Sequence, residues 1–426
     1  MFEIAIACLI ITALAAWVNA RFIRLPNTIG VMAIAMLISL ALLIADRLGY
    51  GEWYHHERRL MESVDFSAVL MNGMLSILLF AGALHVDVSL LGKYRKQVAS
   101  LALVGTAVST LIIGFFLCWV LPMIGLPLSL GYCLLFGALI SPTDPIAVTG
   151  ILQSSGAPDN VSMVVSGESL FNDGVGVVLF TLLVGVAIHD QMPTTGGVLS
   201  LFVTEVGGGL LLGAVLGVVM FLMLRGLDDY SVKVLVTLAG VLGGYELAQL
   251  LHVSGPLAMV VAGLCVGYQG RRFVAKHPTR YSLVLFWKLL DEILNAVLFV
   301  LLGLEIVMVD FQSSYLLAGL VAIVGALAAR LLSVGAPVAM MPRFFKLPPG
   351  AWRILTWGGL RGGISVALVL SLPTSQPVDL LLAMTYAVVV FSILVQGSTM
   401  GAVTRHALGH GHRHAAKAGD VKSPAA

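Results

Sequence analysis

A succession of long apolar runs is the feature that most limits what this chain can fold into. An α-helix needs about 20 apolar residues to cross a bilayer. Runs of about that length lie near residues 2–20, 28–45, 64–84, 98–121, 129–152, 160–188, 199–224, 231–250, 256–269, 282–305, 313–341, 351–372 and 379–402. Only 11% of the residues are charged and 59% are hydrophobic, whereas about 25% charged is usual in a soluble domain. The sequence therefore predicts an all-α, polytopic membrane protein with about 13 transmembrane helices.

The basic residues predict the orientation of these helices, because cytoplasmic loops carry an excess of Lys and Arg. Arg21 and Arg24 follow the first apolar run, which is the reverse of the order in a signal peptide. With the N-terminus outside, the outer loops hold only Arg47, Arg58 and Arg59 of the 24 basic residues. We expect a multi-pass protein of the plasma (inner) membrane with its N-terminus outside and its C-terminus cytoplasmic. The net charge of +2 gives no reason to expect nucleic acid as a partner.

Two of the runs are interrupted near their middle. The fifth contains SPTDP at 141–145, and the twelfth contains WGGLRGG at 357–363. Each proline removes a backbone donor, and the freed carbonyls are tolerated in a membrane only beside a cavity or inside the protein. The breaks are seven helices apart. Because successive transmembrane helices run in opposite directions, two helices separated by an odd number point in opposite directions across the membrane. We therefore expect an inverted repeat of helices 1–6 and 8–13, with the two broken helices 5 and 12 crossing at a midplane binding site.

The sixth run carries two carboxylates and an amide in GESLFNDGVGV at 167–177. A charge at the bilayer centre costs at least about 2.5–3.5 kcal/mol, so it needs a partner, a cavity or an ion. Residues four apart share a helix face. The spacing therefore predicts one row with Glu168 and Asn172 and an adjacent row with Ser169 and Asp173.

We expect these two rows to face different partners. Ser169 and Asp173 supply oxygen donors, and Thr143 and Asp144 would add more from the broken fifth helix. Such an all-oxygen set suits a hard cation.

The other row is expected to face the twelfth helix. There Glu168 would pair with Arg361, which would neutralise two buried charges, and Asn172 would lie on the same side. Arg330, in the eleventh run, is expected to meet a helical carbonyl or an acid near the cytoplasmic side.

These motifs resemble those of NhaP-type sodium/proton antiporters of the monovalent cation:proton antiporter family. The resemblance rests on TDP at 143–145, ESLFNDG at 168–174, LRGG at 360–363 and FAGAL at 80–84. One departure is Ala81, where related proteins often have glutamate, so a carboxylate ligand from the third helix is missing.

The resemblance also implies an architecture and a site. It implies thirteen helices and a homodimer, in which a core (98–188 and 306–402) moves against a scaffold (1–97 and 189–305). We expect the His-rich stretch 403–426 to be a disordered cytoplasmic tail. The implied sodium ligands are Asp173, Thr143 and Ser169, completed by Asp144 and supported by Glu168, Asn172 and Arg361. No cofactor is expected beside the transported sodium ion and proton.

Charge counting predicts the mechanism. Asp173 can hold a proton or a monovalent cation but not both, which makes exchange obligatory. Its neighbour is the neutral Asn172 and not a second aspartate, so we expect one proton per cation and electroneutral antiport.

Two alternatives stay open at this stage. The first is potassium/proton antiport by the same site. The second is an intramembrane aspartyl protease using Asp144 and Asp173. Neither helix shows the Tyr-Asp or Gly-x-Gly-Asp patterns of that protease class.

Overall fold

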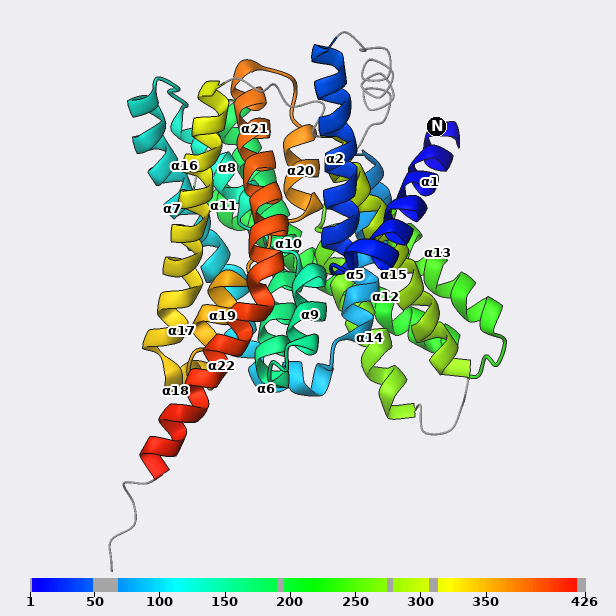
Figure 1. The fold of residues 1–426 in the computed structure, drawn as a ribbon. Helices are drawn as coiled ribbons and strands as arrows, with labels where there is room; N and C mark the ends of the chain where they lie inside the picture. Colours follow the sequence, from blue (N-terminus) through cyan, green and yellow to red (C-terminus); the bar gives the residue numbers. More distant parts are fainter. Residues whose placement is uncertain (1, 49–67, 190–194, 274–278, 306–312, 420–426) are drawn as a thin grey trace, which may run out of the picture.

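The computed structural model describes residues 2–48, 68–189, 195–273, 279–305 and 313–419, and this part of the chain holds helices and no strand (Figure 1). The first ten helices are α1 (Phe2–Val18), α2 (Asn27–Arg47), α5 (Leu75–His85), α6 (Val88–Ala99), α7 (Thr106–Val120), α8 (Leu130–Ile140), α9 (Pro145–Ser154), α10 (Asp159–His189), α11 (Thr195–Phe202) and α12 (Gly208–Leu224). The others are α13 (Tyr230–Leu250), α14 (Gly255–Phe273), α15 (Thr279–Leu304), α16 (Ser313–Arg330), α17 (Ala336–Met340), α18 (Pro342–Phe345), α19 (Ala351–Trp357), α20 (Gly363–Leu370), α21 (Gln376–Phe391) and α22 (Ser398–Gly419). The predicted all-α fold is confirmed.

Many of these helices have the length and composition of membrane spans. Within the described ranges, eight helical stretches are long and apolar enough to cross a bilayer, and three shorter apolar helices accompany them. Large apolar side chains, among them Phe115, Trp119 and Leu211, are exposed on the outer surface of the bundle, where only lipid can cover them at low cost. The structure is that of a multi-pass membrane protein, and the count of thirteen spans stays a prediction.

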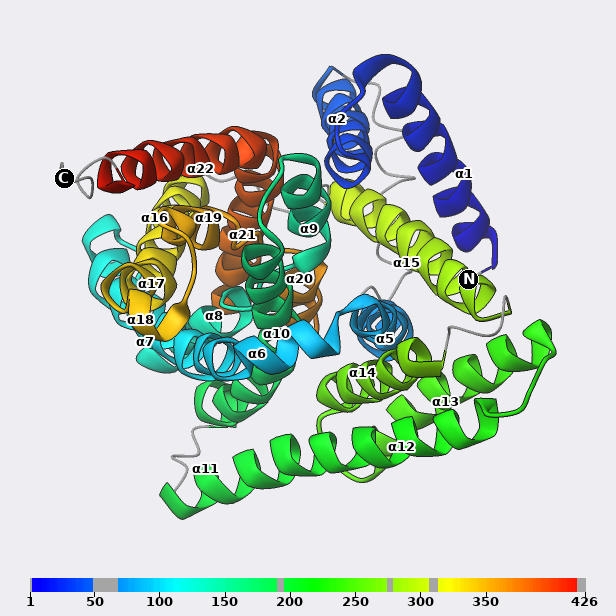
Figure 2. The ribbon, with the colours of Figure 1, turned by 90° about the horizontal axis from the view of Figure 1, so that it is seen from below.

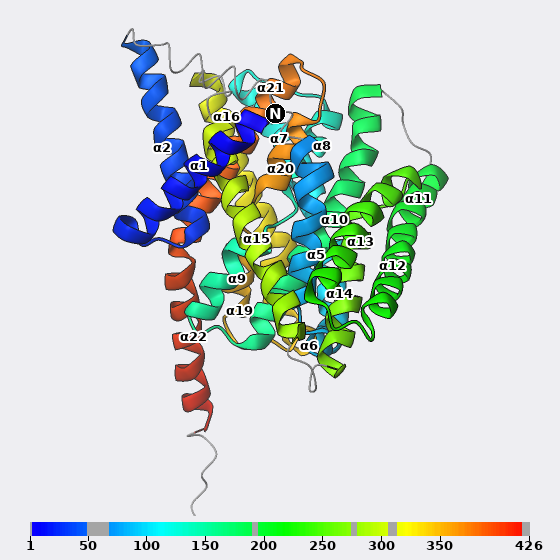
Figure 3. The same ribbon diagram turned by 90° about the vertical axis from the view of Figure 1, so that its right-hand side faces the viewer.

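The helices form two groups that lie side by side when the bundle is seen from below (Figure 2). One group contains α7–α10, α16 and α19–α22, and the other contains α1, α2, α5 and α12–α15. Buried apolar side chains join the two groups, because one apolar cluster contains Phe136 and Leu355 of the first group together with Ile29 and Phe299 of the second. In the second group the rings of Phe80 on α5 and Trp287 on α15 pack with their centroids 4.7 Å apart. In Figure 3, α5 and α15 stand in front of α20, so they form the boundary of the second group towards the first.

Two interruptions of helical structure meet inside the first group. One lies between the end of α8 at Ile140 and the start of α9 at Pro145, and the other between α19 and α20. The extended segments touch each other, since the Asp144 N–H donates to the Leu360 carbonyl at 2.7 Å. A backbone donor released by one break is therefore satisfied by an acceptor released by the other, as burial away from water requires.

The first part of the stretch that we expect to form a tail, residues 403–419, is helical in the structure, and disorder of the tail stays a prediction. Helix α22 extends to Gly419, and Figure 1 shows it running beyond the lower end of the bundle. Its sequence contains several alanines, which are the strongest helix formers, and no proline. The rest of the predicted tail, 420–426, lies outside the described residues.

The contact between α7 and α8 depends on the absence of a side chain at Gly137. A Cβ there would lie 2.4 Å from the Thr110 carbonyl oxygen, whereas a Cβ at Gly150 in α9 would meet nothing within 4 Å. We expect Gly137→Ala to lower the free energy of unfolding by about 1–3 kcal/mol, the usual cost of overpacking. Gly150→Ala is the matched control and should be neutral or slightly stabilising. Thermal unfolding of the purified protein in detergent measures both, and equal melting temperatures would contradict this packing.

Candidate cation site

A network of short polar side chains joins α10 to the break between α8 and α9. The hydroxyl oxygens of Thr143 and Ser169 lie 2.8 Å apart. The Asn172 amide donates to Thr143 Oγ1 at 3.0 Å, and its oxygen accepts from the Thr143 N–H at 3.2 Å. All three side chains are buried. The amide therefore fixes the backbone and the hydroxyl of Thr143 together.

Asp173 lies one turn beyond Ser169 on the same face of α10 and lines a cavity between the two groups of helices. Thr143 and Asp144 line the same cavity from the α8–α9 break, and Gly362 lines it from the α19–α20 break. Ser169 reaches this set through its contact with Thr143. The structure thus brings together the four residues that the sequence predicts as cation ligands.

Two glycines allow the broken segments to approach the carboxylates. A Cβ at Gly176 would lie 2.1 Å from the Pro142 ring, so α10 can cross the first break only because Gly176 has no side chain. A Cβ at Gly362 would lie 2.8 Å from Asp144 Oδ2. The Asp144 carboxylate therefore rests directly against the backbone of the second break.

The predicted ion pair between Glu168 and Arg361 is wrong. Glu168 forms a bidentate pair with Arg330 of α16, with Nη1 to Oε1 at 2.5 Å and Nη2 to Oε2 at 2.6 Å. Arg330 Nε also donates to the Leu355 carbonyl at 3.2 Å. Two parallel N–H···O bonds match the planar guanidinium to the carboxylate, and this is the strongest geometry for such a pair.

Asn172 is also placed differently from the prediction. It donates to Glu168 Oε1 at 3.0 Å as well as to Thr143. Its amide therefore connects the carboxylate to the cation site and does not face Arg361.

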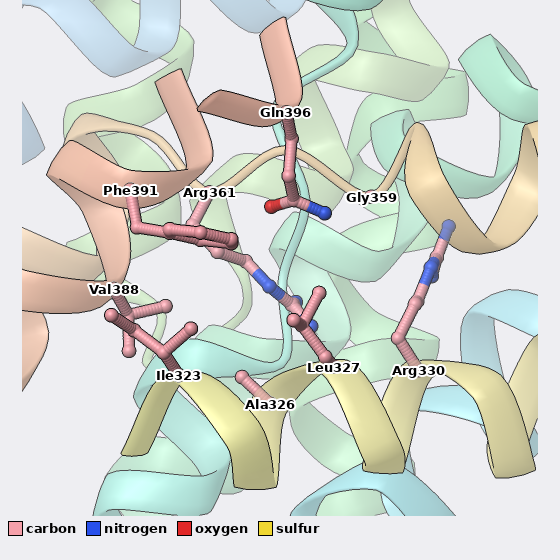
Figure 4. Close-up of a pocket in the computed structure, with 9 residues that line it drawn as sticks. All are labelled: Ile323, Ala326, Leu327, Arg330, Gly359, Arg361, Val388, Phe391 and Gln396. Carbon is pink, nitrogen blue, oxygen red and sulfur yellow. The ribbon is translucent and has the colours of Figure 1, made fainter. Parts of the chain in front are cut away.

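Arg361 binds two backbone acceptors of the first break, one of which, the Ser141 carbonyl, has no helical partner because residue 145 is a proline. Its Nη1 donates to the carbonyls of Ser141 and Pro142, the latter at 2.9 Å, and its own N–H donates to Ser392 Oγ at 2.8 Å. Figure 4 shows its side chain extending from the second break towards α16, with Arg330 further along that helix and Gln396 above. A Cβ at Gly359 would lie 2.5 Å from Arg330 Nε. The absence of a side chain at Gly359 thus makes room for the Arg330 guanidinium group.

The expectation that Arg330 meets a helical carbonyl or an acid agrees with its contacts to the Leu355 carbonyl and to Glu168. The sequence did not identify Glu168 as that acid, because the choice between two arginines for one carboxylate cannot be made from spacing alone. One further residue was missed. Asn295 of α15 was not singled out, although it too is a polar residue within an apolar run. It lines the cavity from the side opposite the breaks.

The arrangement defines a class of protein. Buried oxygen donors beside two interrupted helices, in an all-helical membrane bundle, are typical of secondary transporters that bind a small ion near the membrane midplane.

Comparison with known proteins agrees with that class. The family model described as "Sodium/hydrogen exchanger, transmembrane" matches residues 9–406. The Na(+)/H(+) antiporter NhaP of Pseudomonas aeruginosa is 47% identical over 409 residues, which cover 95% of this chain and 96% of that protein. NhaH of Halobacillus dabanensis, also named as a Na(+)/H(+) antiporter, is 34% identical, with coverages of 89% and 92%. The chain belongs to the sodium/hydrogen exchanger family, whose members are transporters and not enzymes.

A solved structure has the same fold. The sodium proton antiporter MjNhaP1 from Methanocaldococcus jannaschii, determined at pH 8, matches with a TM-score of 0.74 at 21% sequence identity. The match covers 95% of this chain and 97% of that one. The resemblance to NhaP-type antiporters is confirmed, and the aspartyl protease alternative is excluded.

The pairing of Glu168 can be tested by a double-mutant cycle. Removing one partner of a buried ion pair costs about 3–5 kcal/mol because the other charge stays buried and unpaired. We therefore expect Glu168→Gln and Arg330→Met to be strongly destabilising alone and much less than additive together. The cycle of Glu168→Gln with Arg361→Met should show weaker coupling. Unfolding free energies measure both cycles, and stronger coupling to Arg361 would contradict the pairing described here.

Proposed function

We propose that the protein exchanges sodium ions for protons across the membrane, one for one, with Asp173 as the group that the two ions share. The observation that carries this proposal is the position of Asp173. It is a buried carboxylate that lines a cavity together with Thr143 and Asp144, next to the Thr143–Ser169 hydroxyl pair. Carboxylate and hydroxyl oxygens are ligands that a hard cation prefers.

The formal charges around the site support a one-to-one stoichiometry. Glu168, Asp144 and Asp173 contribute three negative charges when ionised, and Arg330 and Arg361 contribute two positive charges. The set carries one net negative charge, so one monovalent cation or one proton brings it to zero. A neutral site crosses the low-dielectric part of the membrane at far lower cost than a charged one. Without a bound ion the site keeps its net negative charge, so the empty carrier does not change its side of access. Sodium flux and proton flux are therefore coupled.

The ion-pair and amide network would hold the site together in both loaded forms. Arg330 neutralises Glu168, Glu168 fixes Asn172, and Asn172 fixes Thr143. None of these contacts uses the Asp173 carboxylate, which therefore stays available for the transported ion. In this proposal Arg361 keeps the first break open by occupying its carbonyls.

The two groups of helices suggest how access alternates. We propose that the group containing the two breaks (98–188 and 306–402) is a mobile core, and that 1–97 and 189–305 form a scaffold. The cavity lies between them, so a displacement of one against the other would open it to one side at a time. The proposal includes a homodimer joined through the scaffold, residence in the plasma (inner) membrane, an outer N-terminus and a cytoplasmic C-terminus.

Sodium is the cation that we propose, and the printed names of the relatives agree with this choice. Potassium/proton antiport is the second candidate, since hydroxyl and carboxylate ligands accept either ion. A series of alkali cations applied to the purified protein in liposomes separates the two.

Replacement of Asp173 tests the central assignment. Asp173→Asn removes the only charge that, in this proposal, a proton and a cation share, so we expect no sodium-driven proton movement above that of empty liposomes. Asp159→Asn is the matched control, because it makes the same chemical change on an exposed residue of the same helix, and it should leave exchange unchanged. Measurable exchange by Asp173→Asn would refute the assignment.

Membrane voltage tests the stoichiometry. Moving one net charge through 100 mV changes the driving force by about 2.3 kcal/mol, whereas one-for-one exchange moves none. We expect the initial rate of sodium-driven proton movement to be the same when potassium and valinomycin clamp the liposomes at zero or at a large potential. A rate that follows the imposed voltage would show that unequal numbers of protons and cations are exchanged, and it would refute the one-for-one stoichiometry.

A further inference from the structure

The two walls of the Asp173 cavity differ in chemistry. The wall formed by α10 and the two breaks carries Thr143, Asp144, Asp173 and Ser365. The opposite wall is formed by α5, by the π-helical stretch Val69–Met74 that precedes it, and by α15. Among the described lining residues, this second wall is apolar except at one position. Its members are Leu70, Leu75, Leu78, Leu79, Gly82, Leu298 and Asn295.

The orientation of the Asn295 amide is set by its own helix. Its Nδ2 donates to the Asp291 carbonyl at 2.8 Å and to Asp291 Oδ1 at 3.1 Å. Both partners are acceptors, so the atom facing them must be the nitrogen. The oxygen, Oδ1, lies at the other end of the planar amide group and points away from Asp291.

This oxygen has no hydrogen-bond partner. Within the part of the chain that the structure describes, Asn295 Oδ1 is one of a few buried side-chain atoms without one, and only 2% of the residue is exposed. A buried acceptor without a partner is unfavourable, and such groups often mark a functional site. Ser333, Ser375 and Tyr386 carry the other unpartnered atoms, and none of them lines the cavity of Asp173.

We propose that Asn295 is a cation-selecting residue, whose Oδ1 ligates the cation bound at Asp173 when α15 and the two breaks enclose it. The ligand comes from the second wall, where the lining residues of α5 are three leucines and Gly82. An amide oxygen is a suitable ligand for a hard cation. Because it carries no charge, it strengthens binding of a metal ion over a proton without altering the charge balance of the site.

This inference rests on the proposed function. It adds Asn295 as a ligand for the cation, whereas protonation of Asp173 does not require Asn295. Asp291, which orients the amide, lies within electrostatic reach of Asp144. Asp144 and Asp173 already supply two carboxylates to the cavity, and a further charged ligand would disturb the charge balance of the site. Asparagine supplies the oxygen without that charge.

The test compares Asn295→Leu with wild type in proteoliposomes that contain a pH-sensitive dye. Leucine replaces the amide by an apolar side chain of similar size and removes the ligand. We expect the KM for sodium to rise about tenfold, since a bond to a charged group is worth on the order of one such factor. The ratio of lithium to sodium transport should change, and the maximal rate should stay within about twofold. Sodium-dependent thermal stabilisation of the purified variant should also need about tenfold more sodium.

Tyr386→Phe is the matched control, because it removes another unpartnered buried oxygen that lies outside the cavity. It should keep the wild-type KM and lithium-to-sodium ratio. If Asn295→Leu does not assemble, Asn295→Ala removes the same oxygen without filling the space, and the same results are expected.

The outcomes separate this inference from the function on which it rests. If wild type exchanges sodium for protons but the Asn295 variants keep its KM and its lithium-to-sodium ratio, Asn295 is not a ligand and the inference is overturned. A fall in maximal rate and thermal stability at unchanged KM overturns it too, since that result shows a packing role. If wild type itself moves no protons in response to sodium, the proposed function fails first.

Discussion

The bidentate pair between Glu168 and Arg330 is the interaction on which the geometry of the site depends. Both side chains are buried in a membrane-spanning bundle, where an isolated charge would be very costly. The pair ties α10 to α16, and Arg330 Nε ties α16 to the Leu355 carbonyl of α19. From Glu168 the contacts continue through Asn172 to Thr143. The compensated charge of Glu168 thus positions the segment that carries the Thr143 hydroxyl.

The second constraint is the backbone. Prolines in the fifth run and glycines in the twelfth prevent continuous helices, and the exposed polar groups must be satisfied inside the protein. Arg361 donates to the carbonyls of the first break, and the Asp144 N–H donates to the Leu360 carbonyl of the second. Each break therefore supplies partners for the other. The two breaks therefore satisfy each other's backbone polar groups where they cross, and Asp144 and Asp173 lie beside this crossing.

The ionisable groups around the site fall into two sets. Arg330 and Arg361 are occupied by a carboxylate and by backbone carbonyls. Asp173 and Asp144 remain at the cavity. In the proposed mechanism, the charge that changes during transport is thereby separated from the charges that hold the fold. In the proposed mechanism, the surrounding network need not rearrange when a proton replaces a cation.

Much of this could be predicted from the sequence. The apolar runs determine an all-helical membrane bundle, because hydrocarbon leaves the backbone no other partner than its own helix. The i, i+4 spacing places Ser169 in line with Asp173, and the prolines at 142 and 145 locate the first break. These are local properties, and the structure reproduces them.

Only the tertiary structure decided which distant groups meet. Two arginines, Arg330 and Arg361, could have paired with Glu168. In the packed bundle Arg330 forms this pair, and Arg361 donates to backbone carbonyls of the first break. Nothing in the sequence distinguishes Asn295 from other polar residues in apolar runs. Only the packing of α15 places it at the same cavity as Asp173. The continuation of α22 beyond residue 403 was likewise not apparent from a His-rich composition. The physical reason is that periodicity assigns a residue to a face of its own helix, whereas the partner of that face depends on how the helices pack.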